Sequence, residues 1–323
     1  MTNFKRFWRV IALLSLSMSI AYAETIFVTL EKDNALALMD PASGTLIKTI
    51  PIGKRPRGIK LSEDGKTLFI ATSDEDTIKL FDSVTLKATG RLPSGKDPET
   101  FALSADGQRM YISNEDDSLV TVVDVAKKKI INEIKVGVEP EGIATSADDQ
   151  WIASASETTN MVHWIDKKSQ SIVDNTLVDP RPRYLTFTPD SQQLWVSSEM
   201  AGTVMILDVH SRQLIKTIHF DIPGVANDKI QPVGIAIDKN RTHAYIALGS
   251  ANRIAVINAQ TLAVEKYFLV GSRVWNITLS PDQSHLYTAN GGSNDVSIID
   301  LVTQTVTKSV GVGLSPWGIV VKP

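Results

Sequence analysis

A proline recurs along the chain at a spacing of 42 residues, and this period limits the possible folds more than any other feature. The series is Pro56, Pro98, Pro140 and Pro182, then Pro232 after 50 residues, with Val274 and Pro316 following at intervals of 42. A fixed period of this size indicates one supersecondary unit that stacks on copies of itself. With 323 residues, 43% of them apolar, the chain is long enough to bury a large core across such an array.

Each repeat divides at turn signals into four short runs. In one copy these runs cover 58–62, 67–72, 77–81 and 86–92. Apolar and polar residues alternate within them, and β-branched and aromatic residues are frequent, so the runs are predicted to be strands. One position of the first run is large and apolar in all copies and is expected to form the core between repeats: Ile59, Phe101, Ile143, Leu185, Ile235, Ile277 and Ile319.

The turn after the third run begins with Asp or Asn in every copy. These residues are Asp40, Asp82, Asp124, Asp166, Asp208, Asn258 and Asp300. Their side chains can accept hydrogen bonds from the backbone two residues on, which fixes a tight turn. Four antiparallel strands in a unit of this length are typical of a propeller blade.

The two ends of the array predict how it closes. The first run after the N-terminal segment matches a second strand (25–30), and the chain ends after a first strand (317–322). Together the end strands complete one blade, so we predict an all-β, seven-bladed β-propeller occupying residues 24–323 as a single domain. Pairing of the N- and C-terminal strands would leave no free sheet edge there.

The first 23 residues have the pattern of a secretory signal peptide. Lys5, Arg6 and Arg9 precede an apolar run at 10–20, and Ala21-Tyr22-Ala23 offers small residues for cleavage before Glu24. An uncleaved anchor is the alternative, but the run is too short to span a bilayer. We therefore predict a periplasmic protein with no membrane span in its mature form. Removing three cations changes the formal charge from −3 to −6, which argues against nucleic acid as a partner.

Signals for a catalytic centre are weak. The chain has no cysteine, which excludes disulfides, thiol catalysis, iron–sulfur clusters and c-type haem attachment. Its five histidines show no zinc-ligand spacing, and no phosphate-binding loop, nucleophile elbow or EF-hand pattern is present. We expect no metal, no cofactor and no catalytic residue, and we expect the protein to be a monomer.

A ring of residues is expected at one mouth of the central channel, on the face that carries the loops after the second and fourth strands. It consists of the residues after the proline positions: Arg57, Glu99, Glu141, Arg183, Val233, Trp275 and Trp317. All except Val233 are candidate ligand-binding residues, because the arginines could clamp a carboxylate and the tryptophans could form an aromatic wall. Alternatively, Arg–Glu pairs neutralise the channel and the tryptophans are core residues.

Two further features concern the same face. The first residue after each second strand forms an outer ring that is largely acidic: Glu31, Ser73, Glu115, Glu157, Glu199, Gly249 and Gly291. The fourth full copy carries an insertion at 219–229. This insertion is either a tolerated loop or a cover for one mouth of the channel.

The repeat resembles the YVTN family of β-propellers. The resemblance rests on the segments VTVVD at 120–124 and VSIID at 296–300, and on the tetrads at the second strands, such as YISN and YTAN. The whole chain is also similar to periplasmic propeller proteins associated with alcohol catabolism that depends on pyrroloquinoline quinone (PQQ). That resemblance implies an accessory role and supplies no catalytic residues.

Two hypotheses for the function follow. The first is a non-enzymatic periplasmic binding or accessory protein, linked to PQQ-dependent alcohol catabolism or its transport, whose partner is a small acidic ligand or a periplasmic redox or transport protein. The alternative is a propeller enzyme, either a lactonase-like hydrolase or a cofactor-bearing oxidoreductase, with its site at the channel mouth. Because the ring lacks histidine, the sequence favours the first hypothesis.

Overall fold

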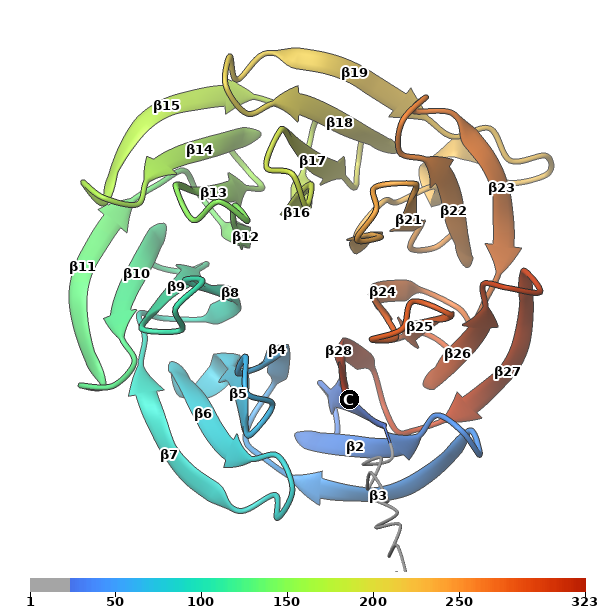
Figure 1. The fold of residues 1–323 in the computed structure, drawn as a ribbon, viewed down its shortest axis with the longest axis horizontal. Coiled ribbons are helices and arrows are strands. Elements are labelled where there is room, and N and C mark those ends of the chain that lie inside the picture. Colours follow the sequence, from blue (N-terminus) through green and yellow to red (C-terminus); the bar gives the residue numbers. More distant parts are fainter. Residues whose placement is uncertain (1–23) are drawn as a thin grey trace, which may run out of the picture.

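Seven four-stranded antiparallel sheets surround a central axis in the computed structural model, which describes residues 24–323 (Figure 1). This arrangement confirms the predicted seven-bladed propeller. The predicted signal peptide, 1–23, lies outside the described residues. Within residues 24–323, no helix is both long and apolar enough to cross a bilayer.

The blades are numbered by their innermost strands, which come first in each list. Blade 1 contains β4 (Pro56–Leu61), β5 (Thr67–Thr72), β6 (Thr77–Asp82) and β7 (Ala88–Pro93). Blade 2 contains β8 (Pro98–Leu103), β9 (Arg109–Asn114), β10 (Leu119–Asp124) and β11 (Lys129–Lys135). Blade 3 contains β12 (Pro140–Thr145), β13 (Trp151–Ser156), β14 (Met161–Asp166) and β15 (Ser171–Leu177). Blade 4 contains β16 (Pro182–Phe187), β17 (Gln193–Ser198), β18 (Thr203–Asp208) and β19 (Leu214–His219).

The remaining blades follow the same order. Blade 5 contains β20 (Ile235–Ile237), β21 (His243–Ala247), β22 (Arg253–Asn258) and β23 (Val264–Leu269). Blade 6 contains β24 (Val274–Leu279), β25 (His285–Asn290), β26 (Asp295–Asp300) and β27 (Thr305–Gly311). Blade 7 contains β28 (Pro316–Lys322), β1 (Thr25–Leu30), β2 (Ala35–Asp40) and β3 (Thr45–Pro51). Two short 3₁₀ helices are η1 (Ser73–Glu75) and η2 (Asn227–Lys229).

Blade 7 closes the ring with strands from both ends of the chain. β28 pairs antiparallel with β1, so that Thr25 faces Lys322 and Ile26 faces Val321. The pairing confirms the predicted closure and leaves neither end strand with a free edge at this joint.

The core consists of seven apolar clusters, one between each pair of neighbouring blades. The predicted series from Ile59 to Ile319 is buried in all seven blades. Second strands such as β9 are covered on both faces, whereas outer strands such as β3 are mostly exposed. Burial of apolar surface between blades is therefore the main force that holds the ring together.

The Asp turns form as the sequence predicts. In blade 1, Thr85 donates a backbone hydrogen bond to Asp82 Oδ1 over 2.7 Å. That bond, together with the Thr85 hydroxyl, lowers the pKa of the Asp82 carboxyl. Five other copies have the same backbone bond from the third residue on, with distances of 2.6–2.9 Å, and in the remaining copy Ala42, two residues on, donates to Asp40 over 2.9 Å. These turns fix the phase of every third and fourth strand.

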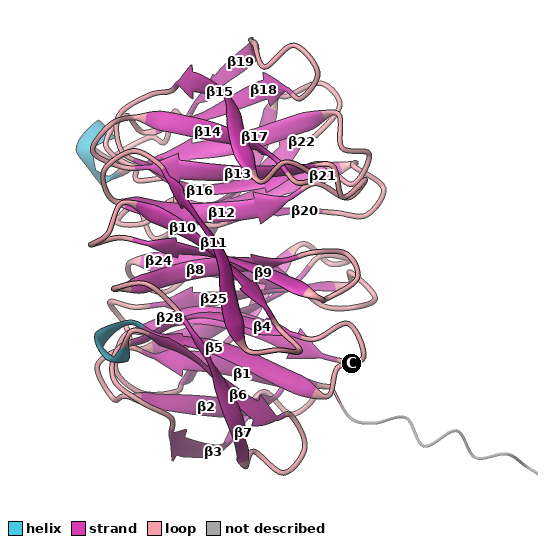
Figure 2. Cartoon of the chain, turned by 90° about the vertical axis from the view of Figure 1, so that its left-hand side faces the viewer, coloured by secondary structure: helices cyan, strands magenta, loops and turns pink. Residues whose placement is uncertain are grey.

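The propeller has two distinct faces, seen edge-on in Figure 2. The upper face, on the left in Figure 2, carries the turns after the second and fourth strands of each blade and both 3₁₀ helices. The lower face, on the right, carries the other turns and the C-terminus. Innermost strands begin at the upper face, and in most blades a β-bulge follows directly after the proline position, as between Pro56 and Ile59. A bulge changes the direction in which the side chains of a strand point, and these bulges orient the side chains at the mouth.

Candidate active site

All six predicted ligand-binding residues lie at the upper mouth of the channel, at the start of innermost strands. The structure divides them between two ion-pair networks. One contains Arg57, Glu99 and Trp317, and the other contains Glu141, Arg183 and Trp275. Arg–Glu pairing at the mouth agrees with the alternative interpretation from the sequence. Ligand binding by these residues stays a prediction.

The first network joins blades 7, 1 and 2. The Arg57 guanidinium pairs with Glu99 and, over 3.0 Å, with Glu31. Arg55 reaches Glu99 over 2.8 Å and Asp97 over 2.7 Å. Arg57 also lies 5.7 Å from the ring centre of Trp317. Trp317 is buried, and its indole N–H has no hydrogen-bond partner among the described residues.

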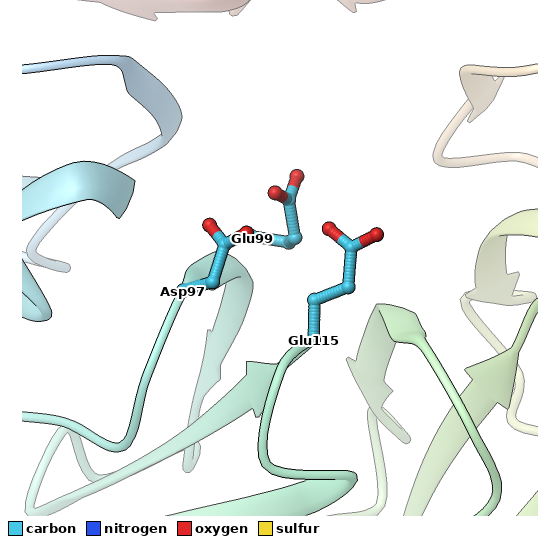
Figure 3. A group of neighbouring side chains, drawn as sticks. All are labelled: Asp97, Glu99 and Glu115. Atoms are coloured by element: carbon cyan, nitrogen blue, oxygen red, sulfur yellow. The ribbon is translucent and has the colours of Figure 1, made fainter.

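An acidic cluster belongs to the same network. Asp97, Glu99 and Glu115 place carboxylate oxygens within 4.8 Å of one another (Figure 3). Burial, opposed by the two arginines, raises the pKa of Glu99 to about 8. Arg55 and Arg57 pair with Asp97 and Glu99, so arginines of the chain itself balance the negative charge of the cluster.

The second network joins blades 3 to 6. Arg183 Nη1 pairs with Glu157 and, over 2.7 Å, with Glu141. Arg181 Nε lies 2.9 Å from Glu157 and 3.2 Å from Glu199. Arg181 lies at the rim, whereas Arg183 is buried and the Glu141, Glu157 and Glu199 side chains are 4%, 3% and 7% exposed.

An arginine pair and a tryptophan complete the second network. Arg273 Nη2 lies 2.7 Å from Glu199. The Trp275 ring lies under two guanidinium groups, with its centre 4.2 Å from that of Arg273 and 5.5 Å from that of Arg183. Gly291 makes room for the tryptophan, because a Cβ there would lie within 3.0 Å of the indole nitrogen. This half of the mouth therefore presents both positive charge and an aromatic face.

Glu141 and Glu157 are two carboxyl groups that contact the same Arg183 nitrogen, Nη1. Burial raises the pKa of Glu141 well above its ordinary value, although Arg183 opposes the shift. Burial also acts on Glu157, but its hydrogen bond from Glu141 and the charges of Arg183 and Arg181 lower its pKa. Two carboxyl groups on one guanidinium thus titrate as a pair with separated steps. The opposite directions of the two pKa shifts favour a proton on Glu141 over one on Glu157.

Arg183 retains an unused donor. Its Nε has no hydrogen-bond partner within residues 24–323, and the nearest carboxylate oxygen, on Glu199, is 3.6 Å away. Buried polar groups are normally hydrogen-bonded. A substrate oxygen could accept a hydrogen bond from this unpaired N–H, which lies beside the two carboxyl groups.

The sequence identified Arg183 and Glu141 but did not assign Glu157 and Glu199 to the site. Both belong to the outer ring of residues that follow second strands. The signal lies in the repeat itself, because Glu31–Arg57 and Glu157–Arg183 have the same separation of 26 residues and both form ion pairs. The end of one second strand therefore lies beside the first strand of the next blade.

The insertion at 219–229 packs at the outer part of blades 4 and 5. Phe220 and Ile222 are buried in the apolar cluster between these blades. Gln231, just beyond the insertion, reaches the mouth, where its side-chain oxygen accepts hydrogen bonds from Arg273 and, over 2.7 Å, from Ser250. The insertion thus contributes to the site through the placement of Gln231.

Two protein families match different parts of the chain. Residues 63–176 match the cytochrome D1 heme domain, and residues 175–309 match the seven-bladed β-propeller lactonases. The chain is a seven-bladed β-propeller of the lactonase and cytochrome D1 type. No curated protein matches its sequence significantly.

Solved structures resemble the whole ring at low sequence identity. The periplasmic gluconolactonase PpgL of Pseudomonas aeruginosa is 16% identical, with a TM-score of 0.77, over 93% of this chain and 99% of that one. A Bacteroides uniformis protein provisionally assigned as a 6-phosphogluconolactonase is also 16% identical, with a TM-score of 0.77, over 93% and 100% of the two chains. Hydrazine synthase of Kuenenia stuttgartiensis is 22% identical, with a TM-score of 0.72, over 81% and 88%.

These matches correct the expected function. The expectation of a non-enzymatic accessory protein of PQQ-dependent alcohol catabolism is wrong, because the lactonase match and the lactonase neighbours favour the enzyme alternative. The sequence argument failed because it treated the lack of histidine in the ring as evidence against catalysis. The buried Glu141–Glu157 pair on Arg183 combines two carboxyl groups whose pKa values shift in opposite directions with a positive charge, and it does so without histidine.

Proposed function

We propose that the protein is a hydrolase that opens a sugar lactone at the second network of the upper mouth. The observation that carries this proposal is the Glu141–Glu157 pair on Arg183, whose two carboxyl groups have pKa values shifted in opposite directions. The match of residues 175–309 to lactonases supports the substrate class.

The proposed reaction uses each member of the pair once. Glu157 accepts a proton from a water molecule as the water oxygen bonds to the lactone carbonyl carbon. The bond between that carbon and the ring oxygen then breaks, and Glu141 donates its proton to the departing oxygen. The proton on Glu157 returns to Glu141 through their hydrogen bond. The product is a hydroxy acid, and the enzyme is restored.

Arg183 stabilises the negative charge that develops on the carbonyl oxygen. Its Nε–H has no hydrogen-bond partner among the described residues and can donate to that oxygen. Glu141 and Glu157 stay in place, because both contact Nη1 instead. Removal of one such donor typically lowers kcat by about 10²–10³-fold. The guanidinium thus fixes the acid–base pair and polarises the substrate at the same time.

Substrate reaches this buried pair past Arg181. The Arg181 side chain is 45% exposed, whereas that of Arg183 is 8% exposed. Displacement of Arg181 by a ligand would uncover Glu157 and Glu199, which it contacts. An acidic group on the substrate would not pair with these glutamates, but it would pair well with the arginine that the substrate displaces. Such a substrate agrees with the small acidic ligand expected from the sequence.

We also propose a periplasmic location. The signal-peptide pattern at 1–23 supports it, and the similar gluconolactonase of P. aeruginosa is a periplasmic protein. N-terminal sequencing of the protein from its native host is expected to give Glu24 as the first residue. A chain that retains Met1 would contradict this part of the proposal.

The hydrolytic function is tested by following acid release from glucono-1,5-lactone and from its 6-phosphate in a pH-stat. The wild-type protein is expected to accelerate opening of at least one lactone above the uncatalysed rate. Glu157→Gln should lower kcat by about 10²-fold or more, because general bases typically contribute 10²–10⁴-fold.

Glu265→Gln is the matched control, because Glu265 lies on the outer strand β23 and takes no part in the mouth. It should retain the wild-type rate, and circular dichroism should show that both variants are folded. The proposal is wrong if the folded wild-type protein opens neither lactone, or if Glu157→Gln and Glu265→Gln have the same rate.

A further inference from the structure

A cavity of about 470 Å³ lies between blades 5 and 6. The turns that line it follow first and third strands, so it belongs to the lower face, away from the upper mouth. Val256, Phe268, Leu279 and Leu301 supply apolar surface to its wall. The volume is in the range of small-molecule sites.

Two carboxylates in this cavity occur in blade 5 alone. Asp238 begins the turn after the first strand, where the five other blades with this turn have Ser or Thr. Ser62 accepts from Thr67 the same backbone bond that Asp238 accepts from His243, so this turn does not require a carboxylate. Glu265 is the second residue of β23, and the corresponding residues of the other blades are uncharged: Ile47, Thr89, Ile131, Val173, Ile215 and Thr307.

The two carboxylates lie on either side of one imidazole ring. His243 Nδ1 is 3.6 Å from Asp238 Oδ2, and His243 Nε2 is 3.4 Å from Glu265 Oε2. A neutral imidazole carries a single N–H. With that hydrogen on Nδ1, towards the buried Asp238, His243 Nε2 and Glu265 Oε2 face each other as two acceptors. A donor from a ligand could then bond to both.

The Tyr245 hydroxyl is a third open group in the same cavity. Tyr245 is only 6% exposed, and its hydroxyl has no hydrogen-bond partner among the described residues. Burial, together with the charges of Asp238 and Glu265, raises the pKa of Tyr245 to about 12. Because buried polar groups are normally hydrogen-bonded, this hydroxyl points to a ligand atom in the cavity.

The charges of the cavity favour a cation. Asp238 and Glu265 are negative, and Lys266 is the positive group among the lining residues besides His243. Lys266 Nζ already donates to Gln304 over 2.6 Å. With a neutral His243, one negative charge is therefore left over. Asp238, His243 and Glu265 are not among the described groups whose ligand atoms all lie within 4.8 Å of one another, so an organic cation fits this cavity better than a metal ion.

We propose that this cavity binds a small primary amine as its ammonium ion, which donates to Glu265, to His243 Nε2 and to the Tyr245 hydroxyl. A primary ammonium has three N–H donors for these three acceptors. The apolar body of the amine lies against Phe268 and Leu279, which line the same cavity. This site is independent of the proposed hydrolysis, because it lies on the opposite face of the ring.

Calorimetric titration with phenethylamine at pH 8 tests the proposal, and phenethyl alcohol serves as its uncharged counterpart. The amine should bind the wild-type protein in a one-to-one ratio and more tightly than the alcohol. Glu265→Gln keeps the shape of the side chain and removes its charge, so it should weaken amine binding by about tenfold, as expected for a hydrogen bond to a charged group. It should leave alcohol binding unchanged. Tyr245→Phe should weaken amine binding by roughly threefold, as expected for a neutral partner.

Glu133→Gln is the matched control, because it removes the same charge from an exposed position on β11, outside the cavity. It should bind the amine as the wild type does. The proposal is overturned if the amine does not bind the wild-type protein, or if Glu265→Gln and Glu133→Gln bind it with equal affinity. Equal binding of the amine and the alcohol would overturn it as well. None of these results depends on whether the protein opens a lactone.

Discussion

At the scale of single residues, burial shifts the pKa values of groups inside this propeller. It raises the pKa of Glu141 and lowers that of His163 in blade 3, and the groups around Glu157 lower the pKa of that carboxyl. His163 Nε2 accepts a hydrogen bond from the Gly137 amide over 2.8 Å, so Nδ1 carries the proton and donates it to Asn175 over 2.6 Å. Each arrangement works in one protonation state only.

His163 makes stability depend on pH. Burial lowers its pKa from 6.5 in the folded protein, so the unfolded chain binds the proton more readily. The stability that depends on neutral His163 is therefore complete above pH 6.5 and is lost as pH falls below it. Thermal melting at pH 7.5 and pH 5 should show a smaller difference for His163→Gln than for the wild type. An equal difference in both proteins would rule out His163 as a source of the pH dependence.

The residues of the mouth were predictable only in part. The repeat fixes which positions reach the channel, so Arg57, Glu99, Glu141 and Arg183 could be named from the sequence. Their partners could not, because the contact between Arg183 and Glu157 crosses from one blade to the next and depends on how the blades pack. The pKa shifts of Glu141 and Glu157 depend in turn on burial, which the spacing of residues does not reveal.

At the scale of elements, the innermost strands pack so closely that some positions accept only glycine. A Cβ on Gly318 would lie well inside 3.0 Å of the Arg57 carbonyl oxygen, which belongs to the neighbouring blade. The Gly318 amide also donates a hydrogen bond to the Thr29 hydroxyl oxygen over 2.8 Å, and that hydroxyl donates to the Arg57 carbonyl oxygen over 2.8 Å. These contacts hold β28 against β4 and so place Arg57 and Trp317 at the mouth.

Gly318→Ala should therefore destabilise the fold. Overpacking of this kind typically costs about 1–3 kcal/mol, and urea unfolding would measure it. Gly311→Ala is the control, because a Cβ there meets no atom within 4 Å, and such substitutions usually change stability by less than about 0.5 kcal/mol. Equal unfolding midpoints for the two variants would contradict the close packing of the innermost strands.

The strands were predictable because each blade repeats the same pattern of alternating residues and turns. Seven copies of one Asp or Asn position fixed the phase of the pattern, and all seven side chains accept a backbone hydrogen bond from two or three residues on. The lower half of the channel was not predictable in the same way. Of the seven equivalent positions four residues after each proline position, six have small or short-branched side chains and the seventh is Lys60, and the sequence analysis considered the upper mouth alone.

At the scale of the whole molecule, stability depends on closure of the ring. β28 contributes the buried residues Trp317, Ile319 and Val321 and covers the edge of β1. Burial of each such side chain contributes roughly 1.5–3 kcal/mol, and a domain is stable by only about 5–15 kcal/mol.

Deletion of 314–323 is therefore expected to unfold the protein or to cause association through the exposed edge of β1. Gel filtration and thermal melting would detect either outcome. Deletion of Pro323 alone should have little effect, because that residue lies beyond β28. A truncated protein that remains monomeric and melts like the full chain would show that closure by β28 is not required.

The pH dependence of lactone opening tests the proposed site most directly. Glu157 must be ionised, and its pKa is lowered; Glu141 must be protonated, and its pKa is raised. The value of kcat/KM should therefore be constant across neutral pH, fall in acid as Glu157 gains a proton, and fall in alkali as Glu141 loses one. Glu141→Gln should lose most of this activity. A kcat/KM that rises steadily into alkaline pH, and does so equally in Glu141→Gln, would contradict the account.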